Sequence, residues 1–169
     1  GSSLDQCGPE WDWDKISEQL GNAGIQYEAI FTEHRNHAVF LAEEHFNAGY
    51  NKVIVVGGDG TMNEVVNGIF RQQRFQTDEI TLGMITVGTG NDWGRMYDIP
   101  AKYKKAIKTI IKGKTFVQDA GRVEYENGGG TITRYFANIA GMGYDAMVAQ
   151  KTNHLKDKGK GGPFAYIYN

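Results

Sequence analysis

The 169-residue chain lacks several features that mark particular classes of protein. Cys7 is its one cysteine, so no disulfide can form within it, and a reducing, cytoplasmic setting is expected. No apolar run reaches the roughly 18 residues of a membrane-spanning helix, and no signal-peptide pattern opens the chain. The 18 Lys and Arg are balanced by 20 Asp and Glu, so the composition indicates no nucleic-acid partner.

The chain is rich in glycine, and the glycines are clustered. Of its 23 glycines, most gather at 57–60, 88–94, 128–130 and 159–162. The first two clusters directly follow runs of apolar residues that predict strands. Loops that follow strands are where α/β proteins bind their ligands, so these two clusters are the first candidates for a site.

Periodicity predicts alternating strands and helices over the first two thirds of the chain. Helices are expected over 11–20, from the cap Asn36 to Gly49, over 61–70 and over 102–112, and strands over 26–31, 52–56 and 80–87. After Lys114 the pattern changes to two strands, 116–126 and 131–137. The predicted fold class is therefore α/β: a parallel-sheet domain over 1–113, then the start of a β-rich domain, incomplete, over 114–169.

Apolar spacing also predicts which side chains of the helices face the core. The inward positions are expected to be Val39, Phe40, Ala42 and Phe46, then Met62, Val65, Val66, Ile69 and Phe70, then Tyr103, Ala106, Ile107, Ile110 and Ile111. Thr61 and Glu64 have the spacing of a capping box, which predicts that the third helix begins at Thr61.

The stretch GGDGT, Gly57 to Thr61, joins a predicted strand to a predicted helix. A helix N-terminus offers backbone N–H groups and a positive dipole end, and glycines let a ligand approach closely, so phosphate is the expected guest. Asp59 would repel phosphate unless Mg²⁺ lies between them or Asp59 accepts a proton from an attacking hydroxyl. The simpler alternative is a tight turn in which Asp59 is a local hydrogen-bond acceptor. In a parallel sheet, the loop GTGND at 88–92 would share the same edge.

These motifs carry a resemblance to a known family. GGDGTMNEVVNG followed by VGTGNDWGR resembles the diacylglycerol kinase catalytic domain, in the bacterial lipid kinase branch related to sphingosine kinases. GGDGT alone is less specific, because NAD kinases and phosphofructokinases carry close versions of it. FTEHRNHAVFLAEE and YFANIAGMGYDAMVA extend the resemblance from about Gly21 to about Gln150.

The resemblance implies transfer of the γ-phosphoryl group of ATP, with Mg²⁺, to a lipid hydroxyl such as that of diacylglycerol. It implies an α/β nucleotide domain followed by a β-sandwich, with the active site between them. Asp59 matches the acid that handles Mg²⁺-phosphate or the acceptor hydroxyl. For Glu64 the resemblance allows an indirect contact with the metal ion, and it assigns no direct metal ligand. The implied ATP contacts are Thr32, Gly57, Gly58, Asp59, Gly60, Thr61, Met62, Asn63 and Thr89.

Two departures from the family qualify the hypothesis. Nothing here matches the Asn-Pro loop after the family's first strand, and the chain reaches Asn169 before the acid of the family's β-rich half. These residues alone are therefore expected to be inactive. The leading hypothesis is a cytoplasmic lipid kinase that contacts a membrane surface peripherally and can self-associate. An NAD kinase-like enzyme and a non-catalytic nucleotide- or lipid-binding module are the alternatives.

Three further groups of residues have competing interpretations. His34 and His37 have a spacing found in metal sites, but ordinary polar surface is the stronger interpretation. Trp93 can stack on adenine or anchor its loop in the core, and the core is favoured. The lysines of 102–114 can meet anionic lipid, although a solvated helix face is the commoner explanation.

Overall fold

The computed structural model describes residues 12–87 and 90–140. The chain divides into two compact units, Gly1–Ala137 and Asn138–Asn169. Every helix and strand of the described residues lies in the first unit.

The centre of the first unit is a pair of parallel strands. β1 (Lys52–Gly57) pairs with β2 (Thr81–Thr86) in register from Lys52↔Thr81 to Gly57↔Thr86. The chain between them forms α3 (Asp59–Ile69) and the short helix η2 (Thr77–Glu79). The prediction of a parallel α/β sheet is confirmed, and both strands end at the same edge.

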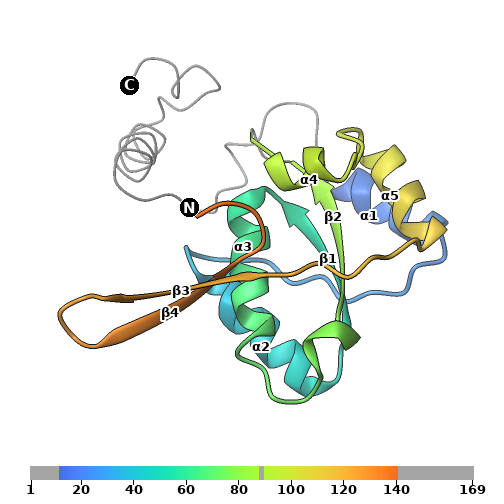
Figure 1. Cartoon of the computed structure of the whole chain (residues 1–169). Coiled ribbons are helices and arrows are strands. Elements are labelled where there is room, and N and C mark those ends of the chain that lie inside the picture. Colours follow the sequence, from blue (N-terminus) through green and yellow to red (C-terminus); the bar gives the residue numbers. More distant parts are fainter. Residues whose placement is uncertain (1–11, 88–89, 141–169) are drawn as a thin grey trace. The chain divides into compact units, whose positions relative to one another are not determined.

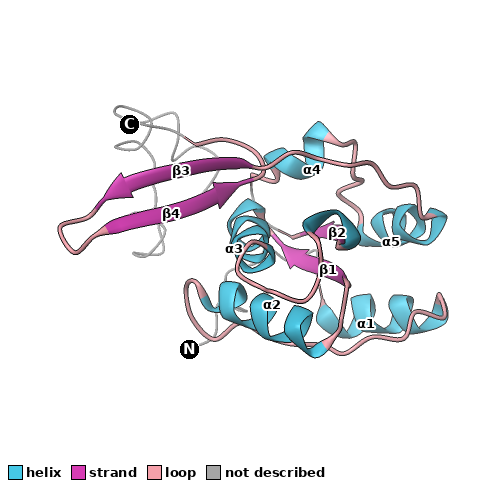
Figure 2. Cartoon of the chain, turned by 60° about the horizontal axis from the view of Figure 1, so that its bottom comes forward, coloured by secondary structure: helices cyan, strands magenta, loops and turns pink. Residues whose placement is uncertain are grey.

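Helices cover both faces of this pair of strands (Figures 1 and 2). α2 (His37–Ala48) and α3 pack on one face, and α1 (Trp13–Asn22) and α5 (Tyr103–Lys112) pack on the other. The strands alternate between the two cores, because successive side chains point to opposite faces. Val55 and Met84 therefore join the core under α2 and α3, whereas Ile85 joins the core under α1 and α5.

α2 and α3 approach each other closely at Gly68. A Cβ atom on Gly68 would lie 2.6 Å from both the Cβ of Ala42 and the carbonyl oxygen of Val39. A larger residue would push the helices apart, so this glycine fixes how α3 lies against its neighbour. The predicted stripe on α3 is confirmed at Met62, Val65, Val66 and Ile69, which are buried, while Phe70 is partly buried.

A β-hairpin follows the last helix. β3 (Gly121–Glu126) and β4 (Thr131–Phe136) are antiparallel and paired from Gly121↔Phe136 to Glu126↔Thr131. The two predicted strands are confirmed, except that 116–120 and Ala137 stay outside the sheet. The Phe136 ring covers Gly121 so closely that a Cβ there would clash with it. The hairpin belongs to the unit that ends at Ala137. A boundary near Gly113 and a β-sandwich beyond it stay predictions.

Some local predictions are wrong. The segment 26–31 is not a strand: Tyr27 and Phe31 pack their rings edge-on against Trp13 of α1, so their alternation serves a helix contact. Phe40 is 52% exposed and lies under the guanidinium of Arg71, 4.8 Å from the ring centre. Ile111 is 53% exposed, because Ala106, Ile107 and Ile110 already fill the side of α5 that meets the sheet.

Candidate active site

Asp59 joins the two glycine loops. It is the first residue of α3, directly after β1 and Gly58. Its Oδ2 accepts a hydrogen bond from the backbone N–H of Asp92 at 2.9 Å, and its Oδ1 accepts one from the N–H of Trp93 at 3.0 Å. These two donors open α4 (Asp92–Met96), the short helix that follows β2. The prediction that both loops meet at one edge is thereby confirmed, and Asp59 is an acceptor for the partner loop rather than for its own turn.

The N-terminus of α3 is accessible beside this carboxylate. Gly58 caps the helix in an extended conformation with φ −104°, so α3 begins at Asp59 and not at Thr61 as predicted. The first N–H groups of any α-helix have no acceptor within the helix, so those of Asp59, Gly60 and Thr61 are suited to a bound anion. Gly60 is exposed, and a Cβ there would meet nothing within 4 Å. This first turn therefore has open space for a ligand.

Gly57 is needed for a different reason. A Cβ on Gly57 would lie 2.9 Å from the Cβ and the Oγ1 of Thr61. The strand can turn directly into the helix only if this position is glycine. Gly57 thus shapes the loop, while Gly60, three residues further on, leaves room in front of it.

Two carboxylates lie beside Gly90 at the same edge. A Cβ on Gly90 would be 3.3 Å from the Oδ2 of Asp59 and 3.9 Å from the Oδ2 of Asp92. Mg²⁺ in nucleotide sites is usually held by one or two carboxylates together with substrate phosphates. In the part of the chain that the structure describes, no three His, Cys, Asp or Glu side chains gather to hold a metal by themselves. The two carboxylates fit a Mg²⁺ ion that takes its remaining ligands from the phosphates of a bound nucleotide.

Glu64 acts on a different helix from the one predicted. Its Oε1 accepts from the N–H of Asn36 at 2.9 Å, and its Oε2 accepts from the N–H of Ala38 at 3.1 Å. Because α3 starts at Asp59, Glu64 lies beyond the first turn and reaches across to cap α2. Asn36 itself has φ 64° and makes no side-chain cap. Glu64 thereby fixes the end of the segment that contains Thr32 against α3.

The other predicted site residues differ in accessibility. Asn63 and Thr32 are exposed, but Met62 is 1% exposed within the core, so only its backbone can meet a ligand. Thr89 lies outside the described residues. The rings of His34 and His37 stack at 4.5 Å and belong to no metal-binding group within the described ranges.

Trp93 has the predicted core role. It is buried, at 7% exposure, and contributes to the core formed with α2 and α3. Its Nε1–H donates to the Oε1 of Gln118 at 3.0 Å, and the Nε2 of Gln118 donates to the carbonyl of Ala137 at 2.5 Å. The second glycine loop is thus anchored through Trp93 to the end of the hairpin.

Asn67 is a structurally important residue that motif reasoning missed. It is buried on α3, at 5% exposure, and its side chain bonds both backbone groups of Tyr135 in β4. Its Nδ2 donates to the carbonyl of Tyr135 at 2.8 Å and to that of Asn63 at 2.8 Å, while its Oδ1 accepts from the N–H of Tyr135 at 3.0 Å. The amide side chain therefore makes the two hydrogen bonds to Tyr135 that a neighbouring strand would otherwise make. A buried polar position inside an apolar helix stripe was the available signal.

Replacement of Asn67 by leucine is expected to lower the free energy of unfolding by at least about 2 kcal/mol, because it leaves partly buried backbone groups of β4 without partners. Urea unfolding measures this change. The matched control is Asn63→Leu, an exposed position on the same helix, which should shift stability by less than about 0.5 kcal/mol. Equal effects of the two substitutions would contradict the assigned role.

Comparison with known proteins gives consistent results. Residues 7–123 match the family model described as the diacylglycerol kinase catalytic domain. The chain is 39% identical over 148 residues to a diacylglycerol kinase of Staphylococcus epidermidis, covering 88% of this chain and 43% of that protein. The corresponding enzyme of Staphylococcus aureus is 37% identical over 148 residues, with the same coverage of 88% and 43%.

Solved structures agree with these sequence relatives. A crystal structure of a diacylglycerol kinase from Bacillus anthracis str. Sterne is similar with a TM-score of 0.53 and 27% identity, over 64% of this chain and 40% of that one. The chain thus spans less than half the length of the curated relatives that it matches. Both glycine loops lie within the matched range.

Proposed function

This chain belongs to the diacylglycerol kinase catalytic domain family, and from that premise we propose that it supplies the ATP-binding half of a lipid kinase. The reaction is transfer of the γ-phosphoryl group of ATP to a lipid hydroxyl such as that of diacylglycerol. The observation that carries the proposal is the position of Asp59, which joins both glycine loops beside the open first turn of α3.

ATP would bind with its phosphates against the N-terminus of α3. The N–H groups of the first turn would contact phosphate oxygens, and Gly60 would leave space for them. Thr32, Thr61 and Asn63 would make further contacts, with Thr89 on the second loop. Positioning and charge stabilisation supply most of the catalysis in phosphoryl transfer, so two loops joined through Asp59 suit the reaction.

Asp59 and Asp92 would hold Mg²⁺ between the protein and the phosphates. The ion would neutralise the charge that develops on the transferred group. Each carboxylate oxygen of Asp59 accepts one N–H and still has lone pairs for a metal or for the proton of an acceptor hydroxyl. The two hydrogen bonds fix the direction in which those lone pairs point.

The acceptor lipid would be reached at a membrane surface. No helix among the described residues is long and apolar enough to cross a bilayer. From the lipid substrate that the family membership suggests, we propose peripheral contact with a membrane from the cytoplasm, with no nucleic-acid partner and the capacity to form homo-oligomers.

One observation supports a second candidate function, a non-catalytic nucleotide-binding module. Both oxygens of Asp59 are already used in structural hydrogen bonds to α4. The two candidates, and an NAD kinase-like activity, are distinguished by incubating full-length protein and labelled ATP with diacylglycerol vesicles or with NAD. Label in lipid supports the lipid kinase, label in NAD supports the NAD kinase, and label in neither supports the binding module.

Gly60→Ala tests the nucleotide site. Alanine fits the helical backbone of α3 without a clash, so the melting temperature should stay unchanged or rise slightly. The new methyl group would occupy the space assigned to phosphate, so ATP affinity should fall by at least about tenfold, equivalent to about 1.4 kcal/mol. Calorimetric titration with ATP measures this. Gly129→Ala in the exposed hairpin turn is the control and should bind ATP normally; unchanged affinity of Gly60→Ala would favour a simple turn.

A further inference from the structure

The outer surface of α5 is made almost entirely of lysine. The exposed positions of the helix are Lys104, Lys105, Lys108, Thr109, Ile111 and Lys112. Lys102 precedes the helix and Lys114 follows it, and the stretch 99–118 has six lysines and no acidic residue. The opposite side of the helix, with Ala106 and Ile107, is buried against the sheet, so the lysines are held outward by packing.

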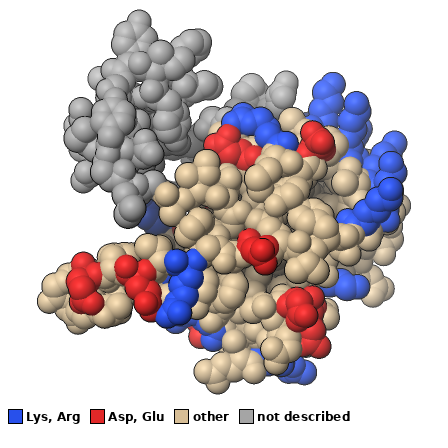
Figure 3. All heavy atoms as spheres, viewed as in Figure 1, with Lys and Arg blue, Asp and Glu red and all other residues tan. Residues whose placement is uncertain are grey.

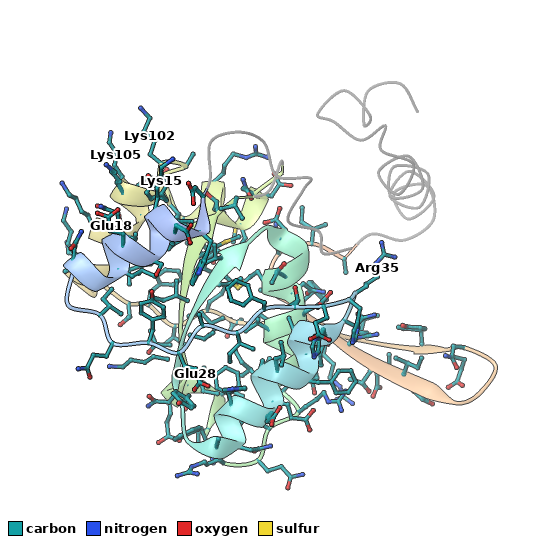
Figure 4. The ribbon with its side chains drawn as sticks, turned by 180° about the vertical axis from the view of Figure 1, so that it is seen from behind. Lys15, Glu18, Glu28, Arg35, Lys102 and Lys105 are labelled. Atoms are coloured by element: carbon teal, nitrogen blue, oxygen red, sulfur yellow. The ribbon has the colours of Figure 1, made fainter. Side chains whose placement is uncertain are left out.

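These lysines form no salt bridge to any residue that the structure describes. Lys15 on the adjacent α1, by contrast, pairs with Asp12 at 3.2 Å. Figure 3 shows blue side chains along the edge of the molecule that α5 forms. Figure 4 places Lys15, Lys102 and Lys105 together, with Glu18 of α1 as an acidic neighbour, and Arg35 far from them on the other side. The positive charge is thus local, although the whole chain has a net charge of -2.

Ile111 gives this surface an apolar element. It is 53% exposed and lies on the same side of the helix as Lys104 and Lys108, because residues three, four or seven apart share a helix face. Lysine stems cover apolar surface while their ammonium groups reach outward. Clusters of four to eight Lys or Arg on an amphipathic helix are typical of segments that bind anionic lipid headgroups.

We propose that the lysine face of α5, defined as Lys102, Lys104, Lys105, Lys108, Lys112 and Lys114 with Ile111, binds the anionic surface of a membrane. The inference rests on the proposed function, because a lipid substrate requires the enzyme to reach a bilayer. The face follows α4 by only a few residues, and Asp59 holds α4 at the phosphate edge. Binding through α5 would therefore bring the nucleotide site close to its acceptor.

Vesicle binding tests the lysine face without catalysis. Full-length protein without ATP is sedimented with vesicles of phosphatidylcholine alone or of phosphatidylcholine mixed with phosphatidylglycerol. Binding should require the anionic lipid and should weaken as salt is raised. At about 1 kcal/mol for each lysine near a charged membrane, Lys104→Glu/Lys105→Glu/Lys108→Glu should weaken partitioning by about 100-fold or more.

A pair of single charge reversals supplies a matched test and control. Lys108→Glu should reduce vesicle binding by at least about fivefold, whereas Lys52→Glu, an exposed lysine at the start of β1, should have little effect. Equal effects of the two substitutions would overturn the proposal, because net charge alone would then explain binding. Tight binding to duplex DNA that is lost in the triple variant would also overturn it in favour of a nucleic-acid surface.

A second assay separates this proposal from the kinase proposal. Diacylglycerol is presented in micelles of a nonionic detergent, where an anionic surface is absent. The triple variant should phosphorylate this substrate at the wild-type rate but lose activity on anionic vesicles. Wild-type protein that binds anionic vesicles but phosphorylates no lipid would reject the kinase and retain the lysine face. A triple variant that keeps full vesicle activity would reject the lysine face and retain the kinase.

Discussion

Replacement of Asp59 by asparagine is expected to lower turnover with lipid and ATP by at least about 100-fold. The substitution removes the negative charge that would hold Mg²⁺ against the phosphates or accept the proton of the attacking hydroxyl. Both roles depend on charge, and asparagine preserves shape without it. Turnover at saturating substrate, measured with full-length protein, is the direct readout.

The same substitution should also reduce stability, for a reason that the geometry makes specific. Asp59 accepts one N–H on each oxygen, from Asp92 and Trp93. Asparagine has one acceptor oxygen, and its NH₂ group would face the second N–H donor. A lost bond of this kind costs about 1 to 3 kcal/mol, so the melting temperature should fall while the protein remains folded at assay temperature.

Asp98→Asn is the control for this substitution. Asp98 is exposed, lies just beyond α4 and has φ 51°, a conformation that asparagine adopts readily. This variant should retain wild-type turnover and stability. A folded Asp59→Asn protein with wild-type turnover would show that Asp59 only links the loops, which is the role expected in a non-catalytic module.

The central elements were predictable because their sequence signals are local and agree with one another. β1 and β2 are short apolar runs that face a helix layer on both sides, which is the pattern of buried parallel strands. The stripe on α3 repeats with helical period and is buried as expected. The meeting of the two glycine loops followed from the direction of the strands alone.

The errors share a physical origin in contacts between distant segments. Glu64 has the right spacing to cap its own helix, yet α3 begins at Asp59 and leaves Glu64 free to cap α2. Tyr27 and Phe31 alternate like strand residues because both meet Trp13. Local spacing cannot distinguish such contacts from regular structure, since the same periodicity serves both.

The meeting of the two glycine loops was predictable, but the contacts between them were not. GGDGT indicates a phosphate loop, but nothing in it states that Asp59 binds the N–H groups of α4. Asn67 has no motif of its own, and its partner Tyr135 lies 68 residues further along the chain. A contact between residues so far apart in the sequence can be recognised only in the structure, where the hairpin packs against α3.

A polypeptide limited to these 169 residues is expected to bind ATP weakly, transfer no phosphate to lipid and self-associate. The relatives that it matches are more than twice as long as the matched segment, which covers 43% of their length. In-line transfer needs the acceptor hydroxyl positioned as well as the phosphate, and the proposed nucleotide half supplies one wall only. Loss of the second wall should therefore abolish transfer while leaving the α3 phosphate site in place.

Self-association is expected because apolar side chains before the hairpin and at the end of the described region lack cover. Val117 is 85% exposed and Ile139 is 77% exposed, while Phe136 is partly buried and Tyr166 lies outside the described residues. Sedimentation velocity on the 169-residue polypeptide should show species larger than a monomer, and Val117→Ser/Ile139→Ser should shift them toward monomer, since apolar surface drives the association. Calorimetry should detect weak ATP binding, and labelled ATP should leave diacylglycerol vesicles unlabelled. A clean monomer that phosphorylates lipid would instead show that these residues contain both walls of the site.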